Sequence, residues 1–426
     1  MPATVIIGGQ WGDEGKGKYT DLFAADSDYA VRFQGGNNAG HTVVPADRGK
    51  PIRLHLVPSS IRRSNCTPVI GNGVVVDPEV LVGEVASLGA SGFDMSKLKL
   101  SANAHLIMPY HKVLDRMTER YLGKNKVGTT KKGIGPAYAD KASRIGLRVQ
   151  DLFDEKILLE KLESILKEKN QILAKVYNQL PEDPTHVAEV YSSLGKKLGP
   201  YVCDTSALLN DALEHGARVL LEGAQGTMLD IDHGTYPFVT SSSCTVGGAC
   251  SGSGVPPKHI DKVVGVVKAY VTRVGSGPFP TEADKKTQEF LVEKGREFGT
   301  TTGRRRRCGW FDAVVVRYSS RINGFDEIHL TKVDVLGGMP AIPVAVAYEF
   351  SGRRIEELPY HQSEIHHARP VYEELPGWDT DISTVQKPAD LPYQVRQFVD
   401  FVEKTCKCHV ASVSVGPAED QTVYLD

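Results

Sequence analysis

Short apolar runs alternate with longer, more polar stretches along almost the whole chain, as expected for strands and helices in turn. The apolar runs predict strands at 4–8, 29–33, 69–76, 219–222, 263–272, 328–330, 342–350 and 409–415. The longer stretches predict helices at 16–25, 78–88, 151–178, 185–197, 312–321 and 393–404. A segment rich in Gly, Ser and Thr at 234–254 is expected to form a binding loop.

This order of elements predicts an α/β fold. The chain opens with strand, helix and strand, a βαβ unit that favours a parallel sheet covered on both faces. No repeat, low-complexity tract or linker interrupts the alternation. We therefore expect one large domain over residues 1–426 with a mostly parallel central sheet flanked by helices. Inserted helical segments and ligand-binding loops would complete this relative of the P-loop NTPases.

Charge and composition exclude several classes of protein. The 50 Lys and Arg residues nearly cancel the 52 Asp and Glu residues, so the net charge of -2 does not suggest a nucleic-acid or membrane-surface binder. The seven cysteines include no Cys-x-x-Cys pair, which favours reduced thiols. The N-terminus has no basic region before an apolar stretch, and no apolar run is long enough to cross a membrane. We expect a cytoplasmic protein.

The first strand leads into a glycine-rich loop, Gly-Asp-Glu-Gly-Lys-Gly-Lys at 12–18. Backbone N–H groups of such a turn, with the start of a helix, form an anion site. The residue after Lys18 would be Ser or Thr in an ordinary phosphate loop and would hold magnesium, but here it is Tyr19. Asp13 places a carboxylate beside the bound phosphates. That charge is useful if Asp13 coordinates a metal or removes a proton from a substrate.

A second glycine cluster, Gln-Gly-Gly-Asn-Asn-Ala-Gly-His-Thr at 34–42, follows the second predicted strand. The carboxyl ends of two parallel strands would converge here, where open α/β sheets bind ligands. Although a lone histidine is more often structural, His41 in this setting can donate a hydrogen bond or proton to a phosphoryl oxygen.

Both segments resemble those of adenylosuccinate synthetase, and the resemblance extends over more than 400 residues. Further segments resemble that family in the same order: GTTKKGIGPAY at 128–138, EGAQG at 222–226, DIDHGTYP at 230–237, VTSS at 239–242, TTGRRRR at 301–307, TKVD at 331–334 and SVGP at 414–417. The resemblance implies a ligase that couples L-aspartate to IMP with GTP and Mg²⁺. It would form adenylosuccinate, GDP and phosphate through 6-phosphoryl-IMP, the first committed step from IMP to AMP.

The resemblance also implies roles for residues. Asp13 would be the general base and His41 the general acid, while Asp13 and the Gly40 backbone would bind magnesium. Arg144 would reach the IMP phosphate of the neighbouring subunit, which implies a homodimer. The ligand contacts that it implies comprise three sets. For GTP they are Gly12, Asp13, Glu14, Gly15, Lys16, Gly17, Lys18, Gly40, His41, Thr42, Arg306, Lys332, Val333, Asp334, Ser414, Val415 and Gly416. For IMP they are Asp13, Glu14, Gly15, Lys16, Asn38, Ala39, Gly40, His41, Thr130, Arg144, Gln225, Thr240 and Arg304. For aspartate they are Thr300, Thr301, Thr302, Gly303, Arg304, Arg305 and Arg306.

Two of these assignments have a physical basis of their own. The Asp334 carboxylate can accept hydrogen bonds from N1–H and the N2 amine of guanine, which adenine cannot donate. The run Arg304 to Arg307 follows Gly299-Thr300-Thr301-Thr302-Gly303, and a flexible loop with bidentate guanidinium groups suits a small dicarboxylate. Many relatives carry Thr where Val415 stands, so a contact there that needs a hydroxyl would be lost.

Three other functions compete with this one. A regulatory GTPase also needs a phosphate loop and a guanine-reading aspartate, but Tyr19 opposes it and Asp13 and His41 would have no use. An ATP-dependent ligase or kinase could share the scaffold, and comparison of ATP with GTP would distinguish it. A catalytically silent relative would not be expected to retain all the candidate residues.

Overall fold

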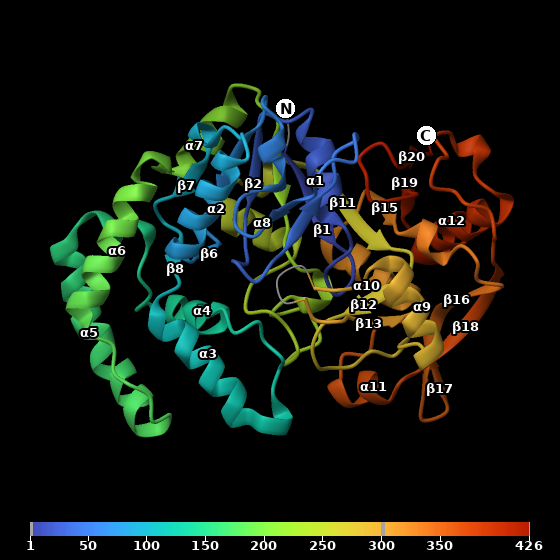
Figure 1. Ribbon diagram of the computed structural model, residues 1–426. Helices are drawn as coiled ribbons and strands as arrows, with labels where there is room; N and C mark the ends of the chain where they lie inside the picture. Colours follow the sequence, from blue (N-terminus) through green and yellow to red (C-terminus); the bar gives the residue numbers. More distant parts are fainter. Residues whose placement is uncertain (1–2, 300–302, 426) are drawn as a thin grey trace.

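The computed structural model describes residues 3–299 and 303–425, which form an α/β fold around a large central sheet (Figure 1). Neighbouring strands of this sheet are parallel except at the end, where β20 pairs antiparallel with β19. Its ten strands lie in the order β20 (Thr422–Tyr424), β19 (His409–Ser414), β15 (Glu327–Thr331), β11 (Ile260–Lys268), β1 (Ala3–Gly8), β10 (Val219–Glu222), β2 (Tyr29–Arg32), β5 (Thr67–Ile70), β7 (Lys99–Ser101) and β9 (Val202–Cys203). The expected fold class is confirmed.

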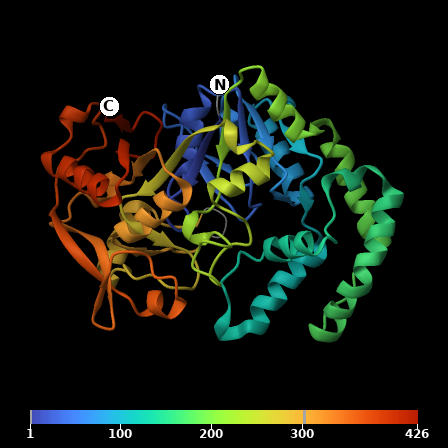
Figure 2. The same ribbon diagram turned by 180° about the vertical axis from the view of Figure 1, so that it is seen from behind.

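Helices cover both faces of the sheet: α1 lies on one face and α8 on the other (Figure 1 and Figure 2). Six of the helices begin after an aspartate whose side chain accepts a backbone N–H of the first turn, which stabilises the start of each helix. The helices are α1 (Lys16–Ala24), α2 (Pro78–Ala90), α3 (Pro109–Leu122), α4 (Ile134–Ser143), α5 (Glu155–Gln171), α6 (Pro184–Leu198), α7 (Thr205–Glu214), α8 (Val246–Ser253), α9 (Lys285–Gly295), α10 (Ala313–Asn323), α11 (Gln362–His367) and α12 (Tyr393–Cys406).

Smaller sheets complete the fold. One comprises β14 (Phe311–Asp312), β16 (Ala341–Phe350), β17 (Arg353–Ile355) and β18 (Arg369–Pro376). Three pairs are β12 (Val271–Arg273) with β13 (Arg307–Gly309), β3 (His41–Val43) with β4 (Ile52–Leu54), and β6 (Val75–Val76) with β8 (His105–Leu106). Within residues 3–299 and 303–425, none of the helices has the length and apolar character needed to span a membrane.

Four predicted elements were wrong in their extent. The strand expected at 69–76 is two strands, because the chain at Gly71 and Gly73 packs against other backbone; a Cβ at Gly73 would lie 2.2 Å from the Phe33 carbonyl oxygen. The strand expected at 263–272 is also broken, since β12 leaves the central sheet to pair with β13.

The other two errors concern helices. The helix expected at 151–178 is shorter as an α-helix, because Asp154 caps it at Ile157 N and a π-helical turn, Ile172–Val176, ends it. The loop expected at 234–254 contains α8 in its second half. Small residues in α8 fit the narrow space beside β2, where a Cβ at Gly252 would lie 2.1 Å from the Phe33 carbonyl oxygen.

Candidate active site

A cavity of about 1160 Å³ lies at the carboxyl ends of six neighbouring strands, β19, β15, β11, β1, β10 and β2. Parallel strands bring the segments that follow them to one edge of the sheet, which is where open α/β sheets bind ligands. The cavity is lined by most of the residues predicted for the site: Gly12, Asp13, Glu14, Gly15, Lys16, Gly17, Lys18, Asn38, Ala39, Gly40, His41, Thr42, Thr130, Gln225, Thr240, Gly303, Arg304, Arg306, Lys332, Asp334, Ser414 and Gly416.

The glycine loop after β1 is organised around a buried carboxylate. Glu14 accepts hydrogen bonds from the backbone N–H groups of Gln10 at 3.1 Å and Gly12 at 2.8 Å. Its other oxygen pairs with the Lys16 ammonium at 2.6 Å. A Cβ at Gly226 would lie 2.5 Å from the same carboxylate, so only glycine leaves room for it. Glu14 and Lys16 therefore fix the conformation of the loop.

Asp13 stands at the tip of this loop in an uncommon backbone conformation. Its φ of 60° is in the left-handed region, which costs free energy for a residue other than glycine and is frequent at functional sites. Its side chain is 32% exposed and forms an ion pair with Arg306 Nε at 2.7 Å. The carboxylate is thus accessible from the cavity and is accompanied by a buried cation.

His41 and Glu222 form a buried pair across the cavity wall. His41 Nδ1 lies 2.5 Å from Glu222 Oε1, and Glu222 also accepts from the Ser59 hydroxyl at 2.6 Å and the Ser59 backbone N–H at 2.9 Å. Burial would raise the pKa of Glu222, but the hydrogen bond and charge of His41 and the charge of Arg32 lower it to about 2. An ionised carboxylate only accepts, so Nδ1 of His41 carries a hydrogen and Nε2 is the other functional nitrogen.

The segment after β15 places another carboxylate, that of Asp334, at the cavity. Asp334 Oδ1 is buried and has no hydrogen-bond partner among the described residues, and burial raises the pKa of this carboxyl group. Lys332, at φ 62°, donates to the Gly295 carbonyl at 2.6 Å. Lys18 donates to Ser414 Oγ at 2.8 Å and to the Gly416 carbonyl at 3.0 Å, which joins the glycine loop to the segment after β19.

The loop at 299–306, which contains the arginine run, also contributes residues to the cavity. Its two stems are joined by backbone hydrogen bonds from Arg306 N to the Glu297 carbonyl at 3.0 Å and from Gly299 N to the Arg304 carbonyl at 2.8 Å. Gly303, Arg304 and Arg306 line the cavity. The other predicted aspartate contacts at the tip, Thr300, Thr301 and Thr302, lie outside the described residues.

Comparisons with known proteins agree with this geometry. A family model described as adenylosuccinate synthetase matches residues 5–423. The chain belongs to the adenylosuccinate synthetase family. Proteins with that name from Frankia alni and Acidothermus cellulolyticus are 55% and 57% identical to it over 426 residues, covering 100% of this chain and 99% of each relative. The structure of fully ligated adenylosuccinate synthetase from Plasmodium falciparum is 38% identical, with a TM-score of 0.94 and 100% coverage of both chains.

Membership of the adenylosuccinate synthetase family confirms the resemblance found in the sequence. It carries the enzyme activity of that family, which is the GTP-dependent ligation of L-aspartate to IMP in purine nucleotide biosynthesis. The competing interpretation as a regulatory GTPase is not supported.

Four predicted site residues do not line the cavity. Val333 and Val415 are fully buried in the main hydrophobic core, so the side chain of Val415 does not face a ligand. Arg305 is exposed and pairs through its backbone with Phe298. Arg144 is exposed at the end of α4, at φ 63°.

Sequence reasoning missed Glu222, Ser59 and Glu297, although each contacts a predicted site residue. A charged residue that ends an apolar strand, as Glu222 ends β10, was the one available signal. Ser59 and Glu297 belong to no local pattern.

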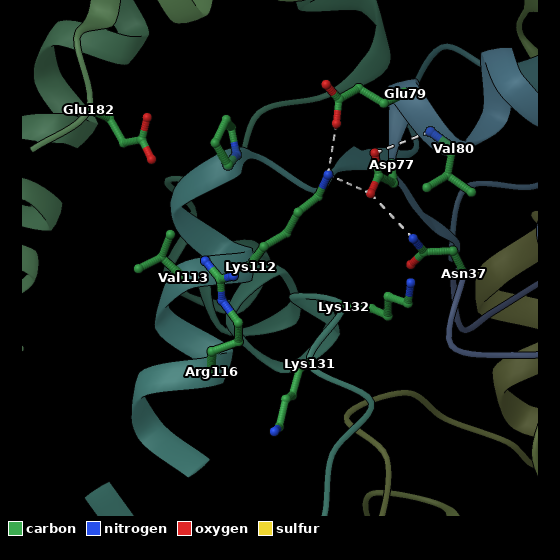
Figure 3. Close-up of a pocket in the computed structure, with 11 residues that line it drawn as sticks. Asn37, Asp77, Glu79, Val80, Lys112, Val113, Arg116, Lys131, Lys132 and Glu182 are labelled. Atoms are coloured by element: carbon green, nitrogen blue, oxygen red, sulfur yellow. Dashed lines mark hydrogen bonds and ion pairs between the residues drawn. The ribbon is translucent and has the colours of Figure 1, made fainter. Parts of the chain in front are cut away.

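A second cavity, of about 420 Å³, lies beside the 34–42 loop (Figure 3). Asp77 links other residues that line this cavity. Its carboxylate pairs with the Lys112 ammonium at 2.8 Å and accepts a hydrogen bond from Asn37 Nδ2 at 3.3 Å. Asp77 also caps α2 through Val80 N. These contacts attach the loop that carries Asn38 to the helices beneath it.

Proposed function

We propose that this chain ligates aspartate to IMP in two steps within the large cavity, with Asp13 as general base and His41 as general acid. The O6 oxygen of IMP is a poor leaving group. Removal of the N1 proton by Asp13 makes O6 a nucleophile towards the γ-phosphorus of GTP, and the bond to the β–γ bridging oxygen breaks to release GDP. The aspartate amine then attacks C6, and phosphate leaves as the C6–O6 bond breaks.

The position of Asp13 supports its role as base. Its carboxylate is exposed to the cavity, and the ion pair with Arg306 Nε at 2.7 Å fixes its position there. The strained loop tip carries the carboxylate into the space where the purine and the phosphates would meet.

The hydrogen-bond partners of His41 support its role as acid. Glu222 holds Nδ1, so Nε2 is left for a phosphoryl oxygen. Burial lowers the pKa of His41, while the hydrogen bond and charge of Glu222 oppose that effect. The negative charge of bound GTP would act in the same direction as Glu222 and favour the protonated imidazole that can act as a donor.

The chain's oxygen atoms fit the magnesium ion that the family generally needs. Mg²⁺ is usually held by one or two carboxylates together with substrate phosphates. Asp13 and the Gly40 backbone both line the cavity, and the described residues contain no cluster of three or more His, Cys, Asp or Glu side chains for a metal. When bound, the ion would neutralise phosphate charge.

We assign the remaining contacts to three subsites of one cavity. Asp334 would read the guanine base, because its unpartnered oxygen can accept from guanine N–H groups. Thr130, Gln225 and Thr240 would contact IMP. The 299–306 loop would enclose aspartate, with Arg304 towards IMP and Arg306 towards GTP.

Two further proposals concern the whole protein. Residues from 11 to 417 line the cavity, so we infer that the chain acts as one catalytic domain. Arg144 is exposed and does not line the cavity of its own chain, which is expected if it serves the IMP phosphate of a partner in a homodimer.

The observation that carries the proposal is the meeting of Asp13, His41 and Asp334 in one cavity. The test is adenylosuccinate formation with IMP, aspartate and GTP, with IMP labelled by ¹⁸O at O6. We expect the label in inorganic phosphate and a much lower rate when ATP replaces GTP.

The Asp13→Ala variant should lose turnover and remain folded, as judged by circular dichroism. Unlabelled phosphate would refute the phosphorylated intermediate. Ordinary turnover by a folded Asp13→Ala protein would refute the assignment of the base.

A further inference from the structure

A buried carboxylate lies just outside the proposed subsites, immediately before the 299–306 loop. Glu297 is fully buried and accepts hydrogen bonds from the Lys268 ammonium at 3.0 Å, from the Tyr270 hydroxyl, and from Arg306 Nη1 at 2.5 Å. The Lys332 ammonium lies 3.9 Å from the same carboxylate. Three cations from separate parts of the chain therefore share one anion.

These cations have different functions. Lys268 ends β11, does not line the cavity and has its other partner in Thr272 at 2.7 Å. Arg306 bridges Glu297 and Asp13 and belongs to the loop proposed for aspartate. Lys332 lies in the segment proposed for guanine. Glu297 thus connects two proposed subsites and one structural lysine.

The charge of Glu297 is needed for this arrangement. Burial would raise the pKa of Glu297, but the charges of Lys268, Lys332 and Arg306 lower it to about 2, so the carboxylate is ionised at neutral pH. Without that charge the three cations would repel one another in a region with little water. The backbone bond from Arg306 N to the Glu297 carbonyl means that any shift of Arg306 would also move the base of the loop.

We propose that Glu297 is a positioning residue that holds Arg306 and Lys332 in place and so couples the aspartate loop to the guanine subsite. This inference rests on the proposed function, because the ligands of Arg306 and Lys332 are assigned there. The IMP contacts Thr130, Gln225 and Thr240 have no bond to Glu297, and Glu297 reaches the IMP subsite only indirectly, through Arg306 and Asp13. IMP binding should therefore depend on Glu297 much less than aspartate and GTP binding do.

The Glu297→Gln variant tests the proposal, because it keeps the shape and removes the charge. We expect the KM values for aspartate and GTP to rise about tenfold each, while the KM for IMP changes less than about twofold. Glu327→Gln is a matched control. Glu327 is another carboxylate whose pKa is lowered to about 2, in this case by hydrogen bonds from His329 and Lys262 against the effect of burial, and it lies at the far end of β15.

The double variant Glu297→Gln/Lys268→Met separates positioning from simple charge compensation. If Glu297 serves as proposed, the double variant regains thermal stability but keeps the raised KM values for aspartate and GTP. It also provides the measurement if the single variant does not fold. Recovery of wild-type KM values in the double variant would show that Glu297 only neutralises Lys268, and unchanged values in a folded Glu297→Gln would equally overturn the proposal. Wild-type protein that makes no adenylosuccinate from GTP would instead refute the proposed function.

Discussion

The Glu222→Gln substitution gives a direct test of the proposed role of His41 as a proton donor. Glu222 accepts three hydrogen bonds through its two oxygens, two from Ser59 and one from His41 Nδ1. Glutamine has the same shape but only one acceptor oxygen, so its NH₂ group must face either the Ser59 backbone N–H or the His41 Nδ1–H. One buried donor is then left without a partner.

The expected loss follows from these contacts. A hydrogen bond to a charged group contributes about 1.5–3 kcal/mol, and the buried Arg32 guanidinium would also lose an opposing charge. We therefore expect the free energy of unfolding to fall by about 2–4 kcal/mol. Loss of one charge-assisted contact to His41 predicts a decrease in kcat of about 10- to 100-fold, since 1.4 kcal/mol corresponds to a factor of ten.

The pH profile distinguishes a change in His41 from a general loss of structure. Because the Glu222 carboxylate raises the pKa of His41, its removal lowers that pKa and the protonated imidazole is lost at a lower pH. In Glu222→Gln, the fall of kcat on the alkaline side of the pH profile should therefore occur at a lower pH than in the wild-type protein. Ser59→Ala keeps the carboxylate charge, so kcat should fall at the same alkaline pH as in the wild-type protein. A folded Glu222→Gln protein with wild-type kcat and an unchanged profile would refute this account of His41.

Two other predictions concern the ligands and the dimer. Asp334→Asn should raise the KM for GTP about 100-fold, because two charge-assisted hydrogen bonds are weakened. The variant should also use xanthosine triphosphate better than the wild-type protein does, because O2 of xanthine accepts a hydrogen bond from the new amide. Equal losses with both nucleotides would contradict the base-reading role. Arg144→Leu should weaken IMP binding, and a 1:1 mixture with Asp13→Ala subunits should recover about one quarter of wild-type activity, because half of the dimers then contain one complete site. An inactive mixture of subunits that exchange would count against a shared site.

The parts of the site that could be predicted from sequence are those whose residues are neighbours in the chain. The loops at 12–18, 34–42 and 331–334 each follow an apolar strand, so the parallel sheet brings them to one edge. The extents of strands such as β5 and β11 could not be predicted in the same way. They depend on close contacts with Phe33 and on pairing with β13, which join distant parts of the chain.

The partners of the buried carboxylates could not be predicted from the sequence. His41 and Glu222 are 181 residues apart, and the Ser59 contacts to Glu222 span 163 residues. A single Glu has no periodicity, and its partners become neighbours only when the sheet has formed. The same holds for Glu297, whose partner Lys268 lies at the end of β11, 29 residues earlier in the chain. These residues support the side chains that the motifs reveal, and their own sequence context carries little signal.

Tyr19 occupies the position at which an ordinary phosphate loop has the serine or threonine that binds magnesium. Its ring is fully buried in the core beneath α1, 4.5 Å from the ring of His329, and its hydroxyl lies 3.0 Å from Ser412 Oγ. The position after Lys18 therefore faces the sheet, and a serine or threonine there would leave a void in the core instead of reaching a metal at the cavity. Under the proposed function, a magnesium ligand would come from another part of the loop. Asp13 and Glu14 both line the cavity, but Glu14 is already paired with Lys16, which leaves Asp13 as the candidate. The buried position of Tyr19 in α1 and the cavity position of Asp13 before α1 are thus compatible with one proposed metal site.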